Sequence, residues 1–319
     1  MATIALSRTG QKVPLVGFGL WKVTKSSTAD TVYKALQAGY RLLDGAGDYG
    51  NEKEAGEGLA RAIKDGVVKR EEVFVTSKLW NTFHAKEHVA KLARKQLADW
   101  QLEYFDLFLI HFPISLKYVD PETRYPPEWF YDGKSQVELQ NTPYEETYHA
   151  METLVDEGLA KNIGISNVNG SLLIDILRYA RIKPAVLQVE LHPYLPQEQL
   201  VTLCKKYDIA ITAYCSFGPA SWLELDMHKH VPSLLDHDVV AQVAKKYSGK
   251  TPAQVLLRWA SQRGIAVIPK SNNHDRLVQN LNHTDITLDE ADIATLTSLN
   301  QNARFNDPGS IDPRIAIFA

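Results

Sequence analysis

The sequence has few of the features that mark secreted, membrane-spanning or nucleic-acid-binding proteins. Its 319 residues include only two cysteines, Cys204 and Cys215. We therefore expect no disulfide framework, and the low cysteine content suits a reducing compartment. No apolar run approaches the roughly 20 residues that a membrane span needs, and none follows a basic start as in a signal peptide. The formal net charge of -3 includes no basic block, which argues against nucleic acid or membrane partners. We therefore expect a cytoplasmic protein.

The chain also lacks a linker that would divide it. No Gly/Ser-rich or Pro-rich segment separates two halves, and apolar residues make up 45% of the composition, ample for one large core. We therefore expect residues 1–319 to form a single domain. No cluster of metal-ligating residues stands out, so no metal is expected.

Short apolar runs alternate with helical patterns after a small hairpin predicted over residues 3–13, with its turn at Thr9-Gly10. The runs are continuously apolar, which is typical of parallel strands buried on both faces. Strands are predicted at 15–19, 40–44, 73–77, 105–110, 161–166, 185–190, 210–214 and 266–270. Helices are predicted at 29–38, 52–64, 86–100, 144–157, 171–180, 197–207, 237–247, 274–281 and 289–299, and another begins at Thr251-Pro252.

About eight strand–helix units favour an α/β fold of the (β/α)₈ TIM-barrel type. The prediction includes the N-terminal hairpin, long loops after the fourth and seventh strands (112–141 and 215–236), and extra C-terminal helices. A doubly wound open sheet is the alternative, and it would place a glycine-rich phosphate turn after its first strand. The segment GFGLWK, residues 17–22, lacks the third glycine of that turn, so the barrel is favoured.

Four reactive side chains stand at the ends of three successive predicted strands. Asp44 ends one strand and Tyr49 follows five residues later, while Lys78 and His111 end the next two. Each alone has a common structural role. Asp44 could start a turn and Tyr49 could be a half-buried aromatic, while Lys78 could be solvated and His111 could be a core residue. Because barrel enzymes carry their chemistry at the carboxyl ends of the strands, we expect the four to converge there.

Together these groups predict a proton donor for a carbonyl oxygen that becomes an alcohol. Tyrosine titrates near pH 10 in water, so Tyr49 needs a nearby cation to act as an acid near neutrality. Lys78 supplies that charge, an ion pair with Asp44 keeps Lys78 charged and aimed, and His111 orients the carbonyl. Since no nucleophile accompanies them, the hydride or electrons must come from a cofactor.

Later strand ends carry polar groups for such a cofactor. Ser166 and Asn167 follow one strand, and Gln188 lies on the next, where a buried amide bridging strands is the alternative role. Tyr214 ends the following strand, with a ring that suits stacking on a flat heterocycle.

The loop after the last predicted strand suits a phosphate. It carries Lys270, Ser271 and Asn272 ahead of a helix that includes Arg276. A cation and a helix amino terminus favour an anion, and barrels often bind phosphate here. Arg276 is suited to stack on an adenine or to grip an extra phosphate. Solvated surface charges are the alternative role of the two cations.

Several spaced motifs resemble the aldo-keto reductases, and they run through essentially the whole chain. They read GFGLWK, LLDGAGDYGNE, VTSKLW, DLFLIHFP, GISN, LQVELHPY and IPKSNNHDRLVQN. The fungal D-xylose reductase branch is resembled more closely, through SLKYVDPETRYPPEW, SFGP with SWLELD, TPAQVLLRWA and RFNDP. The resemblance implies a barrel reductase that uses NADPH, in some members also NADH, to reduce aldose sugars to alditols, as a monomer or homodimer.

The resemblance also implies residue roles. Tyr49 is the acid, Asp44 and Lys78 set its pKa, and His111 orients the carbonyl. The implied coenzyme-binding residues are Ser166, Asn167, Gln188, Tyr214, Ser216, Phe217, Glu224, Lys270, Ser271, Asn272, Arg276, Gln279 and Asn280. The implied sugar-contacting residues are Trp21, Asp48, Trp80, His111, Phe112 and Asn306.

Two departures from the branch fall on the coenzyme clamp. Cys215 stands where a serine commonly follows the stacking tyrosine, and Trp222 replaces a phenylalanine in the loop of Glu224. Glu224 matches the acidic residue that accepts the ribose hydroxyls of NADH. Coenzyme preference therefore stays open, as does the choice between D-xylose and L-arabinose.

Three rival functions are weighed against an aldose reductase. A broad aldehyde reductase shares the chemistry, but Asp48 and Asn306 make the predicted mouth polar. A reductase-like binding subunit would not need the intact acid–base set. A phosphosugar isomerase shares the barrel and the phosphate loop but has no use for Tyr49, Lys78 and Asp44 together. We therefore expect an NAD(P)H-dependent aldose reductase.

Overall fold

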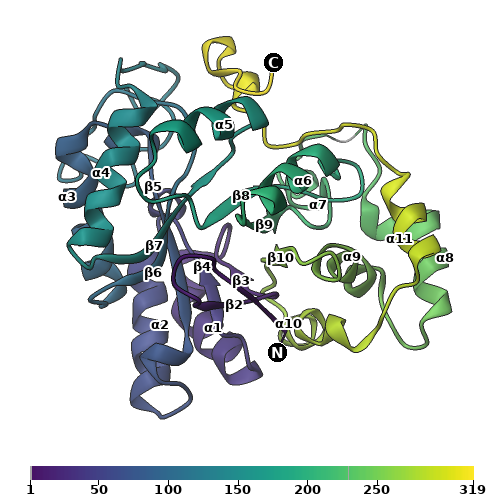
Figure 1. Cartoon of the computed structure of the whole chain (residues 1–319). Coiled ribbons are helices and arrows are strands. Elements are labelled where there is room, and N and C mark those ends of the chain that lie inside the picture. The colour runs from purple at the N-terminus through teal and green to yellow at the C-terminus, as the bar shows by residue number, and fades with distance from the viewer. Residues whose placement is uncertain (1, 229) are drawn as a thin grey trace.

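Eight parallel strands form the centre of the molecule. The computed structural model describes residues 2–228 and 230–319 (Figure 1). Neighbours in the sheet are neighbours in the sequence, and every pair is parallel. The strands are β3 (Phe18–Gly19), β4 (Leu42–Asp44), β5 (Phe74–Leu79), β6 (Phe105–Ile110), β7 (Ala160–Ser166), β8 (Val186–Glu190), β9 (Ala210–Tyr214) and β10 (Ala266–Val267). A parallel bridge between Val16 and Val267 joins the two edges. The predicted (β/α)₈ barrel is confirmed.

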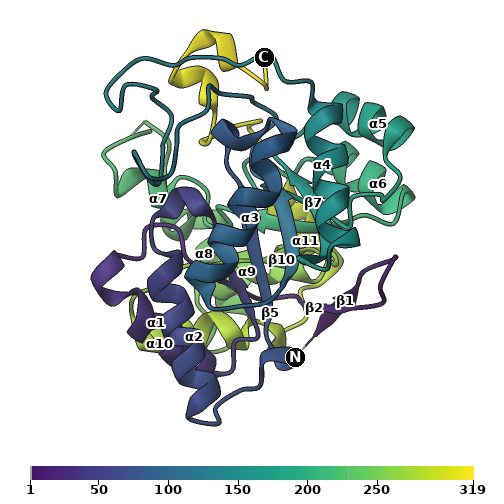
Figure 2. The same cartoon turned by 90° about the vertical axis from the view of Figure 1, so that its left-hand side faces the viewer.

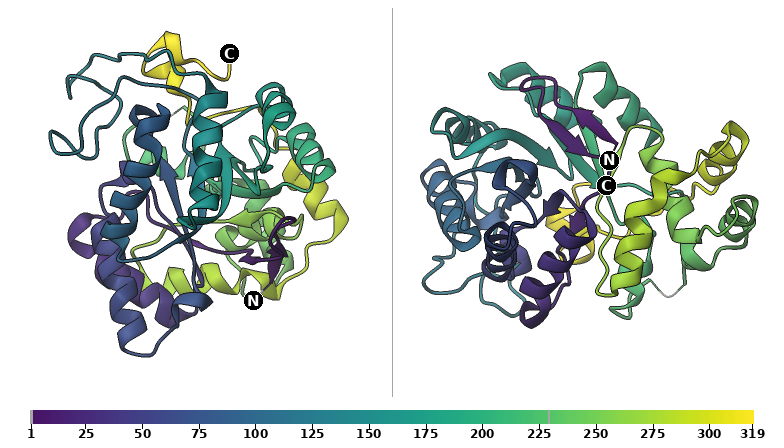
Figure 3. Two further views of the ribbon diagram at one scale, coloured as in Figure 1. Left: turned by 60° about the vertical axis from the view of Figure 1, so that its left-hand side comes forward. Right: turned by 90° about the horizontal axis from the view of Figure 1, so that it is seen from below.

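Helices surround the strands, as the view along the barrel shows (Figure 3, right). An amphipathic pattern buries one face of most of them, although the four-residue helix over Ala220–Leu223 has no buried residue. They are α1 (Lys25–Ala38), α2 (Glu52–Lys64), α3 (Lys86–Trp100), α4 (Tyr144–Asp156), α5 (Gly170–Tyr179), α6 (Glu198–Lys206), α7 (Ala220–Leu223), α8 (Asp238–Lys246), α9 (Pro252–Ser261), α10 (His274–Leu281) and α11 (Glu290–Thr297). The predicted start of α9 is confirmed, with Thr251 in a capping box with Gln254 and Pro252 in the first turn.

The predicted hairpin closes the amino-terminal end of the barrel. It pairs β1 (Thr3–Ala5) with β2 (Lys12–Pro14) in antiparallel register. Leu6 and Val13 pack with buried residues of the strands, among them Leu107. Gln11 Nε2 donates a hydrogen bond to Asp106 Oδ1 at 2.6 Å. Because apolar packing and a part-buried hydrogen bond close this end, we expect a ligand to enter at the carboxyl ends of the strands.

Three irregular segments gather at that open end: the 112–141 loop, the 215–236 loop and the tail after α11 (Figure 2). Arg314 Nη2 of the tail donates to the Val137 carbonyl of the first loop at 2.8 Å. The 112–141 loop, described throughout, contains no helix or strand beyond a bridge between Leu116 and Leu139. Among the described residues, none of the helices is both long and apolar enough to cross a membrane.

Some predicted boundaries are wrong. The first barrel helix begins at Lys25, four residues before the predicted start at 29. The last strand ends at Val267 and not at 270, because Pro269 has no N–H for a ladder hydrogen bond. The 215–236 loop contains α7 and a 3₁₀ turn over Leu234–Asp236, and the tail contains two more, at Pro308–Ser310 and Pro313–Ile315.

Candidate active site

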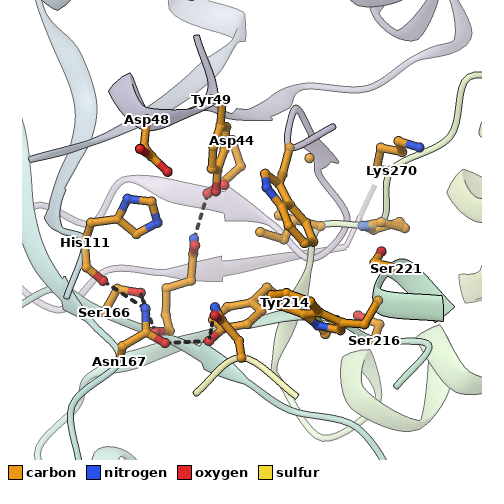
Figure 4. A pocket seen from close by; sticks show the side chains of 18 of the residues that line it. Asp44, Asp48, Tyr49, His111, Ser166, Asn167, Tyr214, Ser216, Ser221 and Lys270 are labelled. Atoms are coloured by element: carbon orange, nitrogen blue, oxygen red, sulfur yellow. Dashed lines mark hydrogen bonds between the residues drawn. The ribbon is translucent and has the colours of Figure 1, made fainter. Parts of the chain in front are cut away.

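A cleft at the carboxyl ends of the strands brings together most of the predicted site residues (Figure 4). Its volume is about 1060 Å³, part of it open to solvent. Predicted residues that line it are Trp21, Asp44, Asp48, Tyr49, Trp80, His111, Phe112, Ser166, Asn167, Gln188, Tyr214, Ser216, Phe217, Lys270 and Asn306.

A buried ion pair lies beneath the cleft. Lys78 Nζ is 2.6 Å from Asp44 Oδ1, and it donates to the Gly45 carbonyl at 2.8 Å and to the Tyr49 hydroxyl at 3.1 Å. The Lys78 side chain is fully buried and Asp44 is 2% exposed. Adjacent β4 and β5 place them, because Asp44 lies opposite Thr76 and Lys78 follows two residues later on the same face. The expected convergence is therefore observed.

The electrostatics of Tyr49 differ from the expectation. Burial, followed by the charge of the Asp44 carboxylate, raises the pKa of Tyr49 well above its ordinary value. Burial also lowers the pKa of Lys78, while Asp44 acts to raise it. Burial therefore outweighs any lowering of the Tyr49 pKa by Lys78, whose Nζ lies 3.1 Å from the hydroxyl, so the net shift is upward and not downward as expected. Tyr49 is thus a protonated phenol at neutral pH, the form that a proton donor needs.

His111 is a neutral ring beside the phenol. Burial and then the charge of Lys78 lower the pKa of His111 well below its usual range. The ring centroids of His111 and Tyr49 are 5.9 Å apart, with an edge-on arrangement. Trp80 packs edge-on at 5.2 Å and donates its own N–H to the Glu128 carbonyl at 3.0 Å. A neutral imidazole in this place is able to donate one hydrogen bond into the cleft.

A chain of hydrogen bonds runs along the other side of the cleft (Figure 4). The Tyr214 hydroxyl donates to Asn167 Oδ1 at 2.5 Å and accepts from Asn306 Nδ2 at 3.1 Å. Asn167 Nδ2 donates to the His111 carbonyl at 2.9 Å. Asn167 has a φ of 59°, a left-handed conformation that asparagine tolerates better than most residues. Residues from β6, β7, β9 and the tail are thereby fixed relative to one another.

Gln188 lies within the barrel mouth and bonds across it. Its Nε2 donates to the second Asp44 carboxylate oxygen, Oδ2, at 2.7 Å. The bridging amide weighed as its alternative role is thus present, although its partner lies on β4 and not on a neighbouring strand. Gln188 therefore also helps to hold the ion pair.

Ion pairs join the 215–236 loop to the barrel near Lys270, which lines the cleft. Glu224 Oε2 lies 2.6 Å from Lys22 Nζ and 3.9 Å from Lys270 Nζ, and Lys22 also donates to the Ser221 carbonyl at 2.5 Å. Burial acts to raise the Glu224 pKa, but the hydrogen bond from Lys22 and the charge of Lys270 lower it. The loop that carries Glu224 is thus tied to the segments that follow β3 and β10. The partnership with Lys22 was not predicted.

Five predicted coenzyme residues lie beyond the cleft lining, in or just before α10. Asn272, Arg276 and Gln279 are exposed, whereas Ser271 and Asn280 are buried. They follow the cleft-lining Lys270 in sequence. The α10 amino terminus is capped by Asn273, whose side chain accepts the Arg276 N–H at 3.0 Å.

A second buried layer supports the ion pair and was not predicted. Glu52 accepts hydrogen bonds from Ser77 at 2.5 Å, from Trp100 at 2.8 Å and from Gln96 at 2.9 Å. Gln96 also donates to the Lys78 carbonyl at 3.2 Å. Burial raises the pKa of Glu52, against the effect of these three hydrogen bonds. Glu52 is the first residue of α2, and its sequence position alone does not indicate these contacts.

The 112–141 loop contributes a wall that the sequence did not indicate. Trp129 lines the cleft and packs edge-on against Trp80, with centroids 4.9 Å apart. Trp222 and Trp21 also line the cleft and pack with centroids 5.2 Å apart. The cleft therefore has aromatic walls around its polar floor.

Several polar atoms of the cleft lack a partner within the described part of the chain. They are Asp48 Oδ1, His111 Nδ1, Ser216 Oγ and Trp222 Nε1. Buried polar groups are normally satisfied, so unpaired ones in a cleft mark contacts for a polar ligand. The donors and acceptors present fit both a carbonyl compound and an amide-bearing cofactor.

Asp48 gives a pH-dependent prediction. Burial, with a contribution from the charge of Glu128, raises the pKa of Asp48 to about 7. A carboxyl with a higher pKa when folded than when unfolded binds more protons in the folded state, so its contribution to stability is lost as pH rises through this window. We expect the free energy of unfolding of Asp48→Asn, relative to the natural protein, to increase between about pH 4 and 7 and then level off. Urea titrations measure it; a constant difference would contradict the assignment.

Comparison with known proteins agrees with this geometry. Residues 15–301 match the model of the aldo/keto reductase family. The chain is 59% identical over 305 residues to a probable NAD(P)H-dependent D-xylose reductase of Aspergillus fumigatus, covering 95% of this chain and 96% of that protein. A protein of the same name from Emericella nidulans is 57% identical over 312 residues, or 97% of each. The aldose reductase structure from Schistosoma japonicum superimposes with a TM-score of 0.88 at 36% identity, covering 100% of this chain and 99% of the other. The chain belongs to the aldo/keto reductase family.

Proposed function

We propose that this protein is an NAD(P)H-dependent reductase that converts aldopentoses, D-xylose and L-arabinose, into xylitol and arabinitol. The observation that carries the proposal is the Tyr49 hydroxyl 3.1 Å from a Lys78 ammonium that is itself paired with Asp44. The names of the D-xylose reductases to which the chain is similar support the substrate class. We further propose that residues 1–319 act as one cytoplasmic domain, as a monomer or homodimer.

Tyr49 is the proton donor in this mechanism. Its protonated phenol gives its proton to the carbonyl oxygen of the sugar as that oxygen becomes a hydroxyl. Lys78, in hydrogen-bond contact, stabilises the negative charge that forms on the phenol oxygen. Neutral His111 donates a hydrogen bond to the same carbonyl oxygen and fixes its direction. General acid catalysis of this kind is typically worth about 10²–10⁴-fold in rate.

The nicotinamide coenzyme, when bound, supplies the hydride. Ser166, Asn167 and Gln188 would hold its carboxamide, and the Tyr214 ring would lie against the nicotinamide. The other residues that would hold it are Ser216, Phe217, Glu224, Lys270, Ser271, Asn272, Arg276, Gln279 and Asn280. The Ser216 hydroxyl, which lacks a partner in the described structure, supports this assignment. Tyr214 is held in place by Asn167 and Asn306.

The sugar would occupy the space between the polar and the aromatic walls. Asp48 and Asn306 suit its hydroxyls, and Trp21, Trp80 and Phe112 cover its apolar face. The same aromatic walls, with Trp129, favour a second candidate function, a broad aldehyde reductase. Rates of NADPH and NADH oxidation across aldoses and plain aldehydes separate the two functions.

Replacing the phenol tests the acid directly. Tyr49→Phe keeps the ring and deletes the donated proton, so turnover of D-xylose should fall by about 10²-fold or more. Coenzyme affinity should stay unchanged, because the hydroxyl bonds to Lys78 and not to the coenzyme residues. Steady-state kinetics and fluorescence titration measure the two. Turnover within a few-fold of the natural protein would show that another group is the acid.

Coenzyme preference is expected to depend on Glu224 and Arg276. A carboxylate facing the ribose hydroxyls favours NADH, whereas a guanidinium pairs with the extra phosphate of NADPH. Glu224→Ala should weaken NADH binding and leave NADPH little changed, and Arg276→Ala should weaken mainly NADPH. Each effect should be several-fold or more, as for hydrogen bonds to charged groups worth about 1.5–3 kcal/mol.

Fluorescence titration of both coenzymes against both variants gives four dissociation constants. Lys22→Ala is the control for movement of the loop. It removes the ion pair that ties the loop to Lys22 but keeps the Glu224 carboxylate. Equal losses of NADH and NADPH affinity in either variant would mean that the residue does not discriminate. If Lys22→Ala reproduced the Glu224→Ala pattern, the effect would belong to the loop and not to the carboxylate.

A further inference from the structure

The C-terminal tail reaches the cleft through one buried carboxylate, that of Glu190 at the end of β8. Its side chain is fully buried. One carboxylate oxygen accepts the Phe305 N–H at 2.9 Å, and the other accepts the Asn306 N–H at the same distance. Hydrogen bonds to an ionised acceptor are roughly twice as strong as neutral ones. Two consecutive peptide groups of the tail are thus held by a single side chain that is 115 residues away in sequence.

A buried imidazole completes this clamp. His192 Nε2 lies 2.9 Å from Glu190 Oε1, and the ring stacks on Phe305 with centroids 5.3 Å apart. The Phe305 carbonyl lies 3.2 Å from His228 Nε2, which belongs to the 215–236 loop. The clamped tail therefore lies between the barrel wall and the loop that carries Glu224.

The clamp leads directly to the cleft. Asn306 lines it and donates to the Tyr214 hydroxyl, which in turn donates to Asn167. Tyr214 lies opposite Glu190 in the register of β8 and β9. Glu190 itself is absent from the cleft lining within the described chain, so it acts on the cleft through the residues that it holds.

We propose that Glu190 is a positioning residue for the reduction of sugars, which fixes Asn306 where the sugar hydroxyls bind. The inference rests on the proposed function and deepens it. It holds that the C-terminal tail recognises the sugar hydroxyls that are far from the carbonyl, and that the Glu190 carboxylate places this tail. A neutral glutamine in its place has one acceptor oxygen, and its NH₂ group would face a peptide N–H. The tail would then lose a defined position while the acid at Tyr49 stays intact.

The test is the substrate dependence of Glu190→Gln. We expect the KM for D-xylose to rise about tenfold, with kcat changed less than threefold and the pH profile unchanged. A short aldehyde such as propanal does not extend to Asn306, so its KM should change less than twofold. In an Asn306→Ala background, Glu190→Gln should add less than twofold to the KM for D-xylose, since residues that act through one another are not additive.

Glu152 on α4 provides the matched control. It is a buried carboxylate that accepts a peptide N–H, that of Ile182, at 2.7 Å and contacts an imidazole, that of His149, at 3.1 Å. Within the described chain it is not one of the residues that line the cleft. Glu152→Gln should lower the melting temperature without changing either KM. If Glu190→Gln does not fold, the KM values for D-xylose and propanal are compared in Glu190→Asp, which keeps the charge.

Equal rises in KM for D-xylose and propanal would overturn the inference, as would an effect fully additive with Asn306→Ala or an unchanged KM. Hydrogen exchange separates this inference from the proposed function. Glu190→Gln should speed exchange of the Phe305 and Asn306 amides at least tenfold whatever the substrate is, whereas unchanged exchange would refute the clamp. A natural protein that reduces propanal but no aldose would refute the proposed substrate instead.

Discussion

The ion pair between Lys78 and Asp44 is the interaction on which the site depends. Both groups are buried, and removal of one partner from a buried pair typically costs about 3–5 kcal/mol, because the other charge is left uncompensated. The protein surrounds the pair with further partners: the Gly45 carbonyl and Tyr49 bond to Lys78, and Gln188 bonds to Asp44. The Lys78 ammonium is therefore fixed in position beside the Tyr49 hydroxyl before a substrate binds.

The barrel makes this arrangement possible and determines where it lies. The ion pair needs β4 and β5 as neighbours, and the Gln188 bond needs β8 on the far side, so the sheet must close before the network is complete. The hairpin covers the other end of the barrel, where Gln11 donates to Asp106. The loops and the tail at that entrance add the aromatic walls and the clamp by Glu190.

The sequence predicted the barrel and the four reactive groups well, because both follow from local patterns. Apolar runs separated by helical repeats give the strands, and a residue that ends a parallel strand must lie at the barrel mouth. Contacts between distant segments could not be predicted in this way, as with Trp129, Glu190 and the pairing of Lys22. The net direction of the Tyr49 pKa shift could not be predicted either, because its largest cause is burial, which only the packed structure defines.

The central claim is that Lys78 acts on Tyr49 through its charge and not by supporting the fold. A double variant, Lys78→Met with Asp44→Leu, removes both charges and leaves no unpaired ion in the core, so the barrel should remain folded. The most direct measurement is its kcat for D-xylose, with coenzyme titration to verify the folded state. The account predicts a loss of about 10²-fold or more with coenzyme binding retained. A folded double variant with kcat within a few-fold of the natural protein would contradict it.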